Sequence, residues 1–459
     1  LAAALALAGC VNLAPDYERP EAPVAQAWPE GESYANSELK REELPKWQTF
    51  IQDDRLKKVI ELALSNNRDL RIAALNVENA RALYGVQRAD LFPTVAAAAS
   101  NATTHRESTD STTHAYSADL AMASYEIDFF GRVRNLTEQA LQTYLQSEDA
   151  QRTTQGTLVS EVTLAWLTLG ANREQLALQK ETLASQEESF RLVGESYKYG
   201  AASRLDYEQA RTTVASARAA ITTYVRAVAQ SKNALELLVG SKVPDELQPS
   251  GVELAATLPA TLPAGLPSDI ISAERGMISA NANIGAARAA FFPSISLTAN
   301  AGSASAHLSD LFGANTGLWS FTPSISIPIF TGGRNLANLR SAEVQEKIAV
   351  ATYEKSIQTA FQEVADALAT EGTVERELKE RREFADAASQ AFELSSARYK
   401  HGAAAYTEVL DAQRTKVSAQ QAVITAELSR ASSLVTLYKV LGGGTELPEP
   451  AKTTEGAEK

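Results

Sequence analysis

Cysteine is nearly absent from this sequence, which has one in 459 residues. A single cysteine excludes an intramolecular disulfide and a cysteine-rich metal site. Histidine is also scarce, and its four copies are not spaced as metal ligands: His105, His114, His307 and His401. The sequence also lacks a Gly-rich phosphate loop and a nucleophile elbow. We therefore expect a protein that is not an enzyme and that uses no cofactor and no metal.

The sequence also has no long apolar run and fewer basic than acidic residues. No run of about 18 apolar residues occurs, so the sequence predicts no transmembrane helix. The 43 Lys and Arg residues are outnumbered by 56 Asp and Glu residues, which gives a net charge of −13. Because nucleic acid is a polyanion, this balance argues against a nucleic-acid partner.

The strongest positive signal is an internal repeat. The stretch from Tyr399 to Arg414 has an echo 202 residues earlier, and each copy places a glycine, Gly200 or Gly402, after a long amphipathic run. Glycine readily adopts the left-handed conformation that ends helices, and a new helical pattern begins within a few residues. Both stretches are therefore interpreted as the tight turns of helical hairpins.

The repeat extends well beyond these turns. The pair Gly131-Arg132 recurs as Gly333-Arg334 at the same offset of 202 residues, although little other identity remains. Equal spacing without identity is typical of helices whose length matters, and it predicts two copies of one structural unit. The runs 132–199 and 334–401 would each be roughly 100 Å long as helices, at about 1.5 Å per residue.

The N-terminal residues are apolar and lead to the single cysteine. Leu7-Ala8-Gly9-Cys10 resembles a bacterial lipoprotein box, in which the cysteine becomes the acylated mature N-terminus. The alternative is a chance cysteine after an apolar run, but this one falls where the motif requires it. We expect residues 1–9 to be the remnant of a signal peptide. Residues 10–52 are rich in proline and are interpreted as a lipidated, extended N-terminal arm.

Two segments depart from helical periodicity. In residues 94–129 and 294–330, apolar residues alternate with small polar ones over limbs of about 10–14 residues, the length of a tilted membrane-spanning strand. Leu120 and Met122 are out of phase with Tyr125, and we expect a β-bulge there. An ordinary soluble hairpin would give the same alternation. Four strands are too few to close a membrane barrel, whereas three copies of the chain would supply twelve.

These patterns predict a chain of mixed α and β class, mostly α-helical, with an internal two-fold repeat. One helical stripe of about ten turns is expected from Asp53 to Leu91, ended by Pro93. The expected divisions are a first repeat (53–240), a linker (241–268), a second repeat (269–442) and a flexible C-terminal tail (443–459).

Several of these stretches resemble the outer-membrane efflux channels of the TolC type. The matching segments are the opening from Trp47 to Ala73, Asp128–Arg132, Ile329–Arg334 and the tip from Tyr399 to Arg414. With the lipoprotein box and the segment Leu13–Pro20, the sequence is most similar to the OprM-like lipoprotein branch. The resemblance covers nearly the whole chain, and its motifs are specific as a set although each is weak alone.

The resemblance implies a homotrimer. Its twelve strands would form a barrel in the outer membrane, and its twelve helices would continue as a coiled-coil tunnel through the periplasm. It also implies a tripartite pump, whose other members are a periplasmic adaptor (membrane fusion) protein and an inner-membrane transporter of the RND type. The chain would be the exit channel for small molecules such as drugs, toxic compounds or metal ions. Val11, which follows the cysteine, favours sorting to the outer membrane.

The resemblance further assigns roles to the two turns. Gly200 and Gly402 would lie at the periplasmic tip, where the helices close the tunnel and the adaptor docks. The candidate gate residues, of which the last is the weakest, are Tyr399, Thr407, Asp411, Arg414 and Asp206. A second set on the first turn is expected to face the adaptor: Lys198, Arg204 and Glu208.

Two of the gate assignments have alternatives in the residues themselves. Asp411 and Arg414 are three residues apart and share one helix face, so they can pair with each other or across protomers. The alternative is an exposed ion pair without a gating role. Thr407 replaces a bulkier apolar residue that is common in this branch, which puts a hydrophobic ring at that level in doubt.

Two other functions fit parts of the sequence. An exit duct for type I protein secretion would have the same architecture, and neighbouring genes would distinguish it from an efflux channel. A structural lipoprotein that spans the periplasm would need no lipid-facing strands, so the two alternating hairpins argue against it.

Overall fold

The computed structural model describes residues 11–25, 27–34, 44–252 and 268–446. Cys10 and the signal-peptide remnant expected at 1–9 lie outside the described residues, as does most of the expected tail. The mainly helical class predicted from the sequence is confirmed, with one antiparallel sheet. In chain order, the helices and strands are α2 (Trp47–Phe50), α3 (Asp54–Asn66), α4 (Arg68–Ala89), β1 (Val95–Arg106), β2 (Ser111–Ile127), α5 (Arg132–Lys198), α6 (Arg204–Val239), α7 (Ser268–Ala289), β3 (Ser294–Ser305), β4 (Gly317–Ser326), α8 (Arg334–Lys400) and α9 (Tyr406–Val440).

The chain divides into two compact units. Unit 1 consists of residues 1–22, 75–148 and 271–356, and unit 2 consists of residues 23–74, 149–270 and 357–459. The internal repeat is visible in the element lengths, because α5 and α8 contain 67 residues each.

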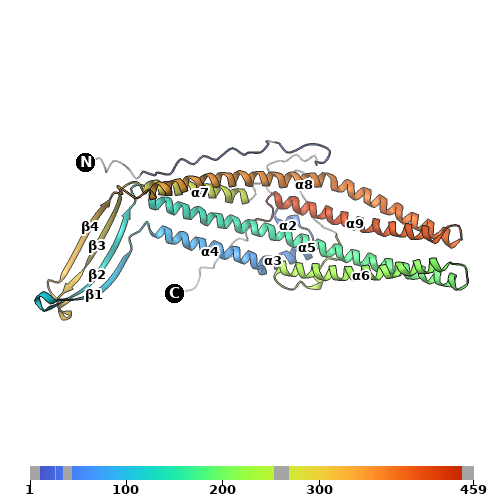
Figure 1. Ribbon diagram of the computed structural model, residues 1–459, viewed down its shortest axis with the longest axis horizontal. Coiled ribbons are helices and arrows are strands. Elements are labelled where there is room, and N and C mark those ends of the chain that lie inside the picture. Colours follow the sequence, from blue (N-terminus) through green and yellow to red (C-terminus); the bar gives the residue numbers. More distant parts are fainter. Residues whose placement is uncertain (1–10, 26, 35–43, 253–267, 447–459) are drawn as a thin grey trace. The chain divides into compact units, whose positions relative to one another are not determined.

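Unit 1 contains the sheet, whose strands lie side by side in the order β1-β2-β3-β4, each antiparallel to the next (Figure 1). Successive side chains of a strand point to opposite faces, so the register assigns every residue to a face. One side, which we call the apolar face, contains Leu120, Met122, Tyr125, Ile127, Ile295, Leu297, Trp319, Phe321 and Ile325. The other, which we call the polar face, contains Ser100, Ser117, Asp119, Glu126, Thr298, Asn300, Ser320 and Thr322.

The expected bulge in β2 is confirmed, and it explains the phase error in the sequence. Met122 pairs with Ala299 and Tyr125 pairs with Leu297, so β2 advances three residues where β3 advances two. Ser124 takes up the extra length with a positive φ of 47°. The bulge thereby returns Tyr125 to the same face as Met122.

Large apolar side chains of the sheet are not covered by other described parts of the same chain. All residues of the edge strands β1 and β4 are exposed, including Trp319, Phe321 and Ile325 at 78%, 60% and 65%. Exposed apolar area of this kind marks a surface that contacts a membrane or another protein. The return strands β2 and β4 end earlier than the hairpins expected from the sequence, at Ile127 and Ser326 instead of positions 129 and 330.

Within unit 1, polar contacts hold the first part of the N-terminal arm against α7 and the end of the first hairpin. Arg19 forms a two-pronged ion pair with Glu274 on α7, and the Tyr17 hydroxyl lies 3.2 Å from the same carboxylate. Burial and the nearby Glu274 charge raise the pKa of Tyr17 to about 12. Farther back, the backbone N–H of Val11 donates to the Phe129 carbonyl at 3.1 Å.

Unit 2 is built around a buried core that joins both repeats. Trp166 on α5 is 1% exposed and donates its indole N–H to the Leu247 carbonyl at 3.0 Å. Phe50 on α2 stacks on Tyr438 of α9, with ring centres 4.0 Å apart. The Tyr438 hydroxyl donates to the Pro45 carbonyl at 2.8 Å. The buried indole N–H of Trp166 and the buried hydroxyl of Tyr438 therefore both have hydrogen-bond partners.

The single helical stripe expected from Asp53 to Leu91 was wrong in one respect, because the chain breaks at Asn67. This residue is extended (φ −62°, ψ 134°) and ends α3. Its side chain accepts from the backbone N–H of Leu70, which caps α4, and donates to the Leu238 carbonyl at 2.8 Å. A cap on α4 and a tertiary contact with α6 therefore stabilise the break.

The expectation of a flexible tail from residue 443 was also wrong for its first four residues. Gly443 and Gly444 are buried, and the Gln155 side chain donates to the Gly444 carbonyl at 3.1 Å. A Cβ atom on Gly156 would lie 2.9 Å from the Gly443 carbonyl oxygen. This close approach is possible only because α5 presents a glycine there.

Among the helices that the structure describes, none combines the length and the apolar character that crossing a membrane would demand.

Candidate functional site at the turns of the helical hairpins

The first turn joins α5 to α6 in unit 2. Gly200 has a positive φ of 76°, as a glycine that ends a helix should. Ser203 then begins α6 with a capping box, in which its hydroxyl accepts from the backbone N–H of Asp206 and the Asp206 carboxylate accepts from the Ser203 N–H at 3.0 Å. Asp206, a weak gate candidate in the sequence, is thus the third residue of α6 and completes the capping box with Ser203.

The second turn joins α8 to α9 and is fastened differently. Gly402 has a φ of 68°, but Ala405 precedes α9 and offers no side-chain cap. Instead, Arg398 forms an ion pair with Glu408 at 3.1 Å and donates to the Ala403 carbonyl at 3.2 Å. Glu408 and Asp206 occupy equivalent positions in the repeat, so one acidic position holds both turns by two different means.

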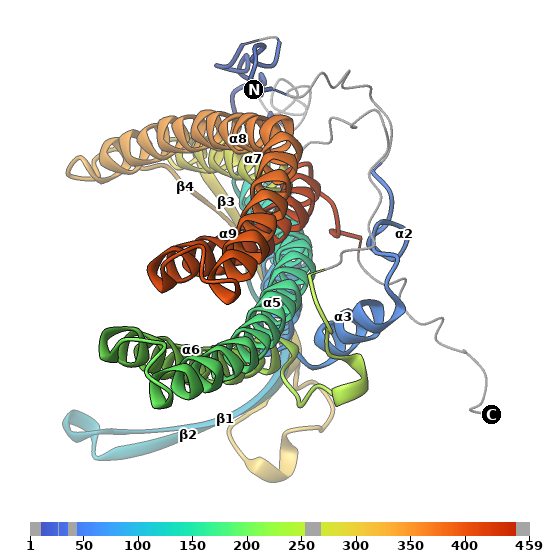
Figure 2. The same cartoon turned by 90° about the vertical axis from the view of Figure 1, so that its right-hand side faces the viewer.

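The helices of the two hairpins, α5 with α6 and α8 with α9, are labelled in Figure 2. An apolar cluster beside the turns brings the two hairpins together. Its buried members are Val193 on α5, Ala210 on α6, and Tyr406, Val409 and Leu410 on α9. We call it the tip cluster. Tyr406 is 3% exposed, and its ring centre lies 5.2 Å from that of Tyr399 on α8.

The Asp206 carboxylate of the first turn contributes to the electrostatics of the two tyrosines of the second. Burial raises the pKa of Tyr406 to about 12, with smaller contributions from Tyr399 and the Asp206 carboxylate. Burial also raises the pKa of Tyr399, again with a contribution from Asp206. Because Asp206 belongs to the first hairpin, the structure brings together Asp206 and Tyr399 from the predicted gate set, and adds Tyr406.

The remaining predicted gate residues lie on the exposed side of α9. Asp411 and Arg414 form an ion pair with 3.7 Å between Oδ1 and Nη1, and their side chains are 78% and 71% exposed. Thr407 is exposed as well. These three residues therefore share the outer surface of the turn, whereas Tyr399 is half-buried beneath it.

The residues expected to face the adaptor are at the surface of the first turn. Lys198 and Arg204 are exposed, and the Lys198 ammonium lies 6.0 Å from the ring centre of Tyr199, which is 81% exposed. Glu208 is partly exposed and pairs with Arg211 at 3.5 Å. The first turn thus presents an exposed tyrosine among charged groups.

The sequence reasoning missed Tyr406 and the pair of Arg398 with Glu408. The capping box at Ser203 and Asp206 was detectable from its spacing of three residues before a helical run. Burial of Tyr406 gave no comparable signal, because it depends on contacts with the other hairpin. Within the described ranges, no group of three or more His, Cys, Asp or Glu side chains is placed to hold a metal.

Comparison with known proteins adds a family to this geometry. The family model described as outer membrane efflux protein matches residues 59–241 and 268–443, which include both hairpins and both turns. The chain belongs to the outer membrane efflux protein family. Its members are efflux proteins and not enzymes, and the location of the chain is the outer membrane.

Individual relatives agree with this assignment. The chain is 46% identical over 457 residues to the solvent efflux pump outer membrane protein SrpC of Pseudomonas putida, covering 96% of this chain and 97% of SrpC. It is 41% identical over 450 residues to the cation efflux system protein CusC of Escherichia coli, with 96% and 97% covered. The crystal structure of the open state of the Neisseria gonorrhoeae MtrE outer membrane channel matches with a TM-score of 0.85 and 35% identity, covering 95% of this chain and 99% of MtrE.

Proposed function

We propose that the chain is the outer-membrane exit channel of a tripartite efflux pump, formed as a homotrimer and gated at its periplasmic tip. The observation that carries this proposal is the sheet of unit 1. Its apolar face is exposed, and its edge strands β1 and β4 each lack a partner strand on their outer side within the described residues. Unpaired edges are a liability that closure into a barrel removes. Three copies supply twelve strands, a number within the range of outer-membrane barrels.

The proposal is tested on the purified protein in detergent and in planar lipid bilayers. In detergent we expect a particle whose protein mass is that of three chains. In planar bilayers we expect ionic conductance only when the protein has been added. A folded monomer that is stable in detergent and forms no channel would overturn both the trimer and the barrel.

The partners proposed for the pump are a periplasmic adaptor and an inner-membrane transporter of the RND type. We propose that the adaptor docks at the first turn, where Lys198 lies beside the exposed ring of Tyr199 and where Arg204 and Glu208 are also at the surface. Exposed charged groups suit a partner that must bind reversibly, since they direct encounter and register more than they add affinity.

Small molecules are the proposed cargo. The relatives named for solvent efflux and cation efflux both align with nearly the whole chain, which supports a duct whose cargo is selected elsewhere in the pump. The alternative, a duct for type I protein secretion, is distinguished by the export defect of a deletion strain. Loss of small-molecule resistance with unchanged protein secretion is expected.

Acylation of Cys10, which precedes the described residues, is proposed as the lipid anchor. The variant Cys10→Ser should lose incorporation of labelled palmitate completely, because no other cysteine is present. The barrel should still insert, with slower sorting to the outer membrane. Equal labelling of the wild type and the variant would contradict the assignment.

The exposed pair of Asp411 and Arg414 is proposed to stabilise the closed tip. At their exposure, such a pair contributes roughly 0.3–0.5 kcal/mol per protomer. Asp411→Ala or Arg414→Ala should therefore increase the open fraction by up to about tenfold over three protomers, at about 1.4 kcal/mol per decade. Glu363→Ala, at an exposed position of α8, is the matched control for channel conductance in bilayers. Conductance that is unchanged in both tip variants would leave the pair as a surface contact.

A further inference from the structure

The strands of the sheet contain very few charges. Apart from histidines, their acidic and basic side chains are Arg106 at the end of β1 and Asp119 and Glu126 on β2. Aspartate is disfavoured in strands, so a mid-strand Asp119 is unusual for the fold alone. All three residues belong to the polar face.

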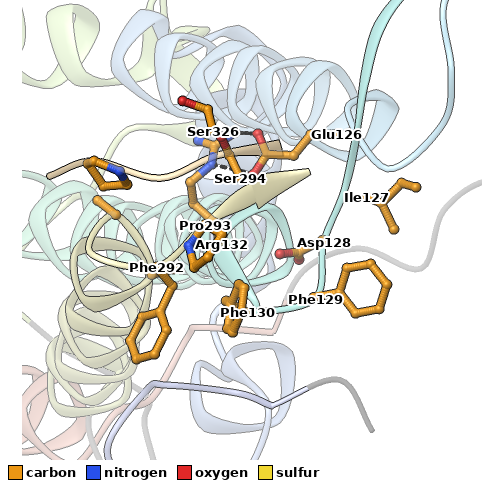
Figure 3. Close-up of a pocket in the computed structure, with 13 residues that line it drawn as sticks. Glu126, Ile127, Asp128, Phe129, Phe130, Arg132, Phe292, Pro293, Ser294 and Ser326 are labelled. Carbon is orange, nitrogen blue, oxygen red and sulfur yellow. Dashed lines mark hydrogen bonds and ion pairs between the residues drawn. The ribbon is translucent and has the colours of Figure 1, made fainter. Parts of the chain in front are cut away.

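Glu126 is neutralised by a partner on the same unit. Its carboxylate forms a two-pronged ion pair with Arg132, the first residue of α5, in a cavity at the base of the sheet (Figure 3). The close-up also shows Ile127 on the other side of β2 from Glu126, as the alternation of the strand requires. The Glu126 charge is therefore balanced locally by Arg132.

Asp119 has no such partner. Within the described part of the chain, its carboxylate makes no hydrogen bond and no ion pair. Its neighbours across the strands are Ala98 on β1 and Gly302 on β3, neither of which has a polar side chain to pair with it. Arg106 lies eight residues farther along β1 than Ala98, roughly 26 Å away at about 3.3 Å per residue. The polar face thus carries one isolated negative charge in its middle.

Gly302 on β3 packs closely against Asp119 on β2. A Cβ atom on Gly302 would lie 2.5 Å from the Cβ of Asp119 and 2.3 Å from the Ala118 carbonyl oxygen. A larger residue at 302 would have to push β2 aside. Gly302 therefore lets the two strands approach with the Asp119 side chain directed away from the apolar face.

We propose that Asp119 sets the cation preference of the open channel. The inference rests on the proposed trimer, in which the apolar face contacts lipid and the polar face lines the lumen. Three copies then place three uncompensated carboxylates around the lumen within the membrane-spanning part. Cations are attracted to this ring and anions are repelled, so Asp119 acts as a specificity-determining residue.

The test is the zero-current potential of the purified protein in planar bilayers under a tenfold KCl gradient at low salt. The wild type should prefer K⁺ over Cl⁻, and Asp119→Asn should reduce the permeability ratio roughly three- to tenfold, towards unity. Asp119→Lys should prefer Cl⁻, and Asp119→Glu should keep the wild-type ratio. Ser117→Ala, on the same face two residues away, is the matched uncharged control.

Salt provides a second, independent criterion. The Debye length is about 30 Å at 0.01 M and about 3 Å at 1 M, so the difference between wild type and Asp119→Asn should vanish at high salt. Open channels with the same low-salt ratio in the wild type and in the Asn and Lys variants would overturn the role of Asp119. Absence of any conductance in the wild type would instead overturn the proposed channel function, so the two failures are distinguishable.

Discussion

The variant Phe321→Lys should fail to assemble in the outer membrane, whereas Thr322→Lys should assemble normally. The two residues are adjacent on the edge strand β4 and point to opposite faces of the sheet. Phe321 is 60% exposed on the apolar face, and a lysine on the lipid face of a barrel costs about 2–4 kcal/mol near the membrane midplane. Three copies in one trimer would cost roughly 6–12 kcal/mol, comparable to the whole stability of a domain.

The measurement is the amount of folded trimer in isolated outer membranes, followed by the number of channels that the extract forms in bilayers. Thr322→Lys changes the same charge at the next residue, but places it on the polar face opposite Thr298. It therefore controls for synthesis, export and strand propensity. Equal assembly of both variants would show that the apolar face does not contact lipid.

The long hairpins and the sheet could be predicted from the sequence because their signals are local. Gly200 and Gly402 end helices in the left-handed conformation, which glycine adopts more readily than other residues. Both have the positive φ of that conformation. The change of phase between Met122 and Tyr125 likewise predicted a bulge. Side chains alternate between faces with a period of two, so an extra residue is needed to place both apolar side chains on the same face.

The features that were missed depend on contacts between distant segments. Asn67 interrupts a stripe that stays in phase on both sides, and its bond to the Leu238 carbonyl has no trace in the local pattern. Residues 443–446 are polar or glycine and look like a frayed end, yet they pack because Gly156 on α5 leaves room for them. At the candidate site, the sequence indicated the turns but not the burial of Tyr406, which is decided by the opposite hairpin.

The second large effect is expected at Tyr406. Its ring is 3% exposed and contacts residues of both hairpins in the tip cluster, so an opening movement that parts the hairpins must expose it. Truncation of a buried aromatic ring to alanine removes about 3–5 kcal/mol. Tyr406→Ala should therefore weaken the closed tip more than loss of the exposed pair of Asp411 and Arg414.

The open fraction measures this loss directly. If only half of the roughly 3 kcal/mol per protomer distinguishes the closed state from the open one, three protomers together shift the equilibrium by about three orders of magnitude, at about 1.4 kcal/mol per decade. Tyr406→Ala should then be open in most bilayer recordings in which the wild type is closed.

Two controls separate gating from general damage. Tyr406→Phe keeps the buried ring and removes only the hydroxyl. Burial raises the pKa of that hydroxyl to about 12, so no charge is lost with it at neutral pH. The open fraction of this variant should therefore stay near that of the wild type. Glu363→Ala, at an exposed position of α8, should behave likewise. If Tyr406→Ala forms trimers of normal thermal stability that stay as closed as the wild type, the tip cluster packs equally well in both states. The gate would then have to be held by the exposed surface of α9, where the effects of Asp411→Ala and Arg414→Ala would become the larger ones.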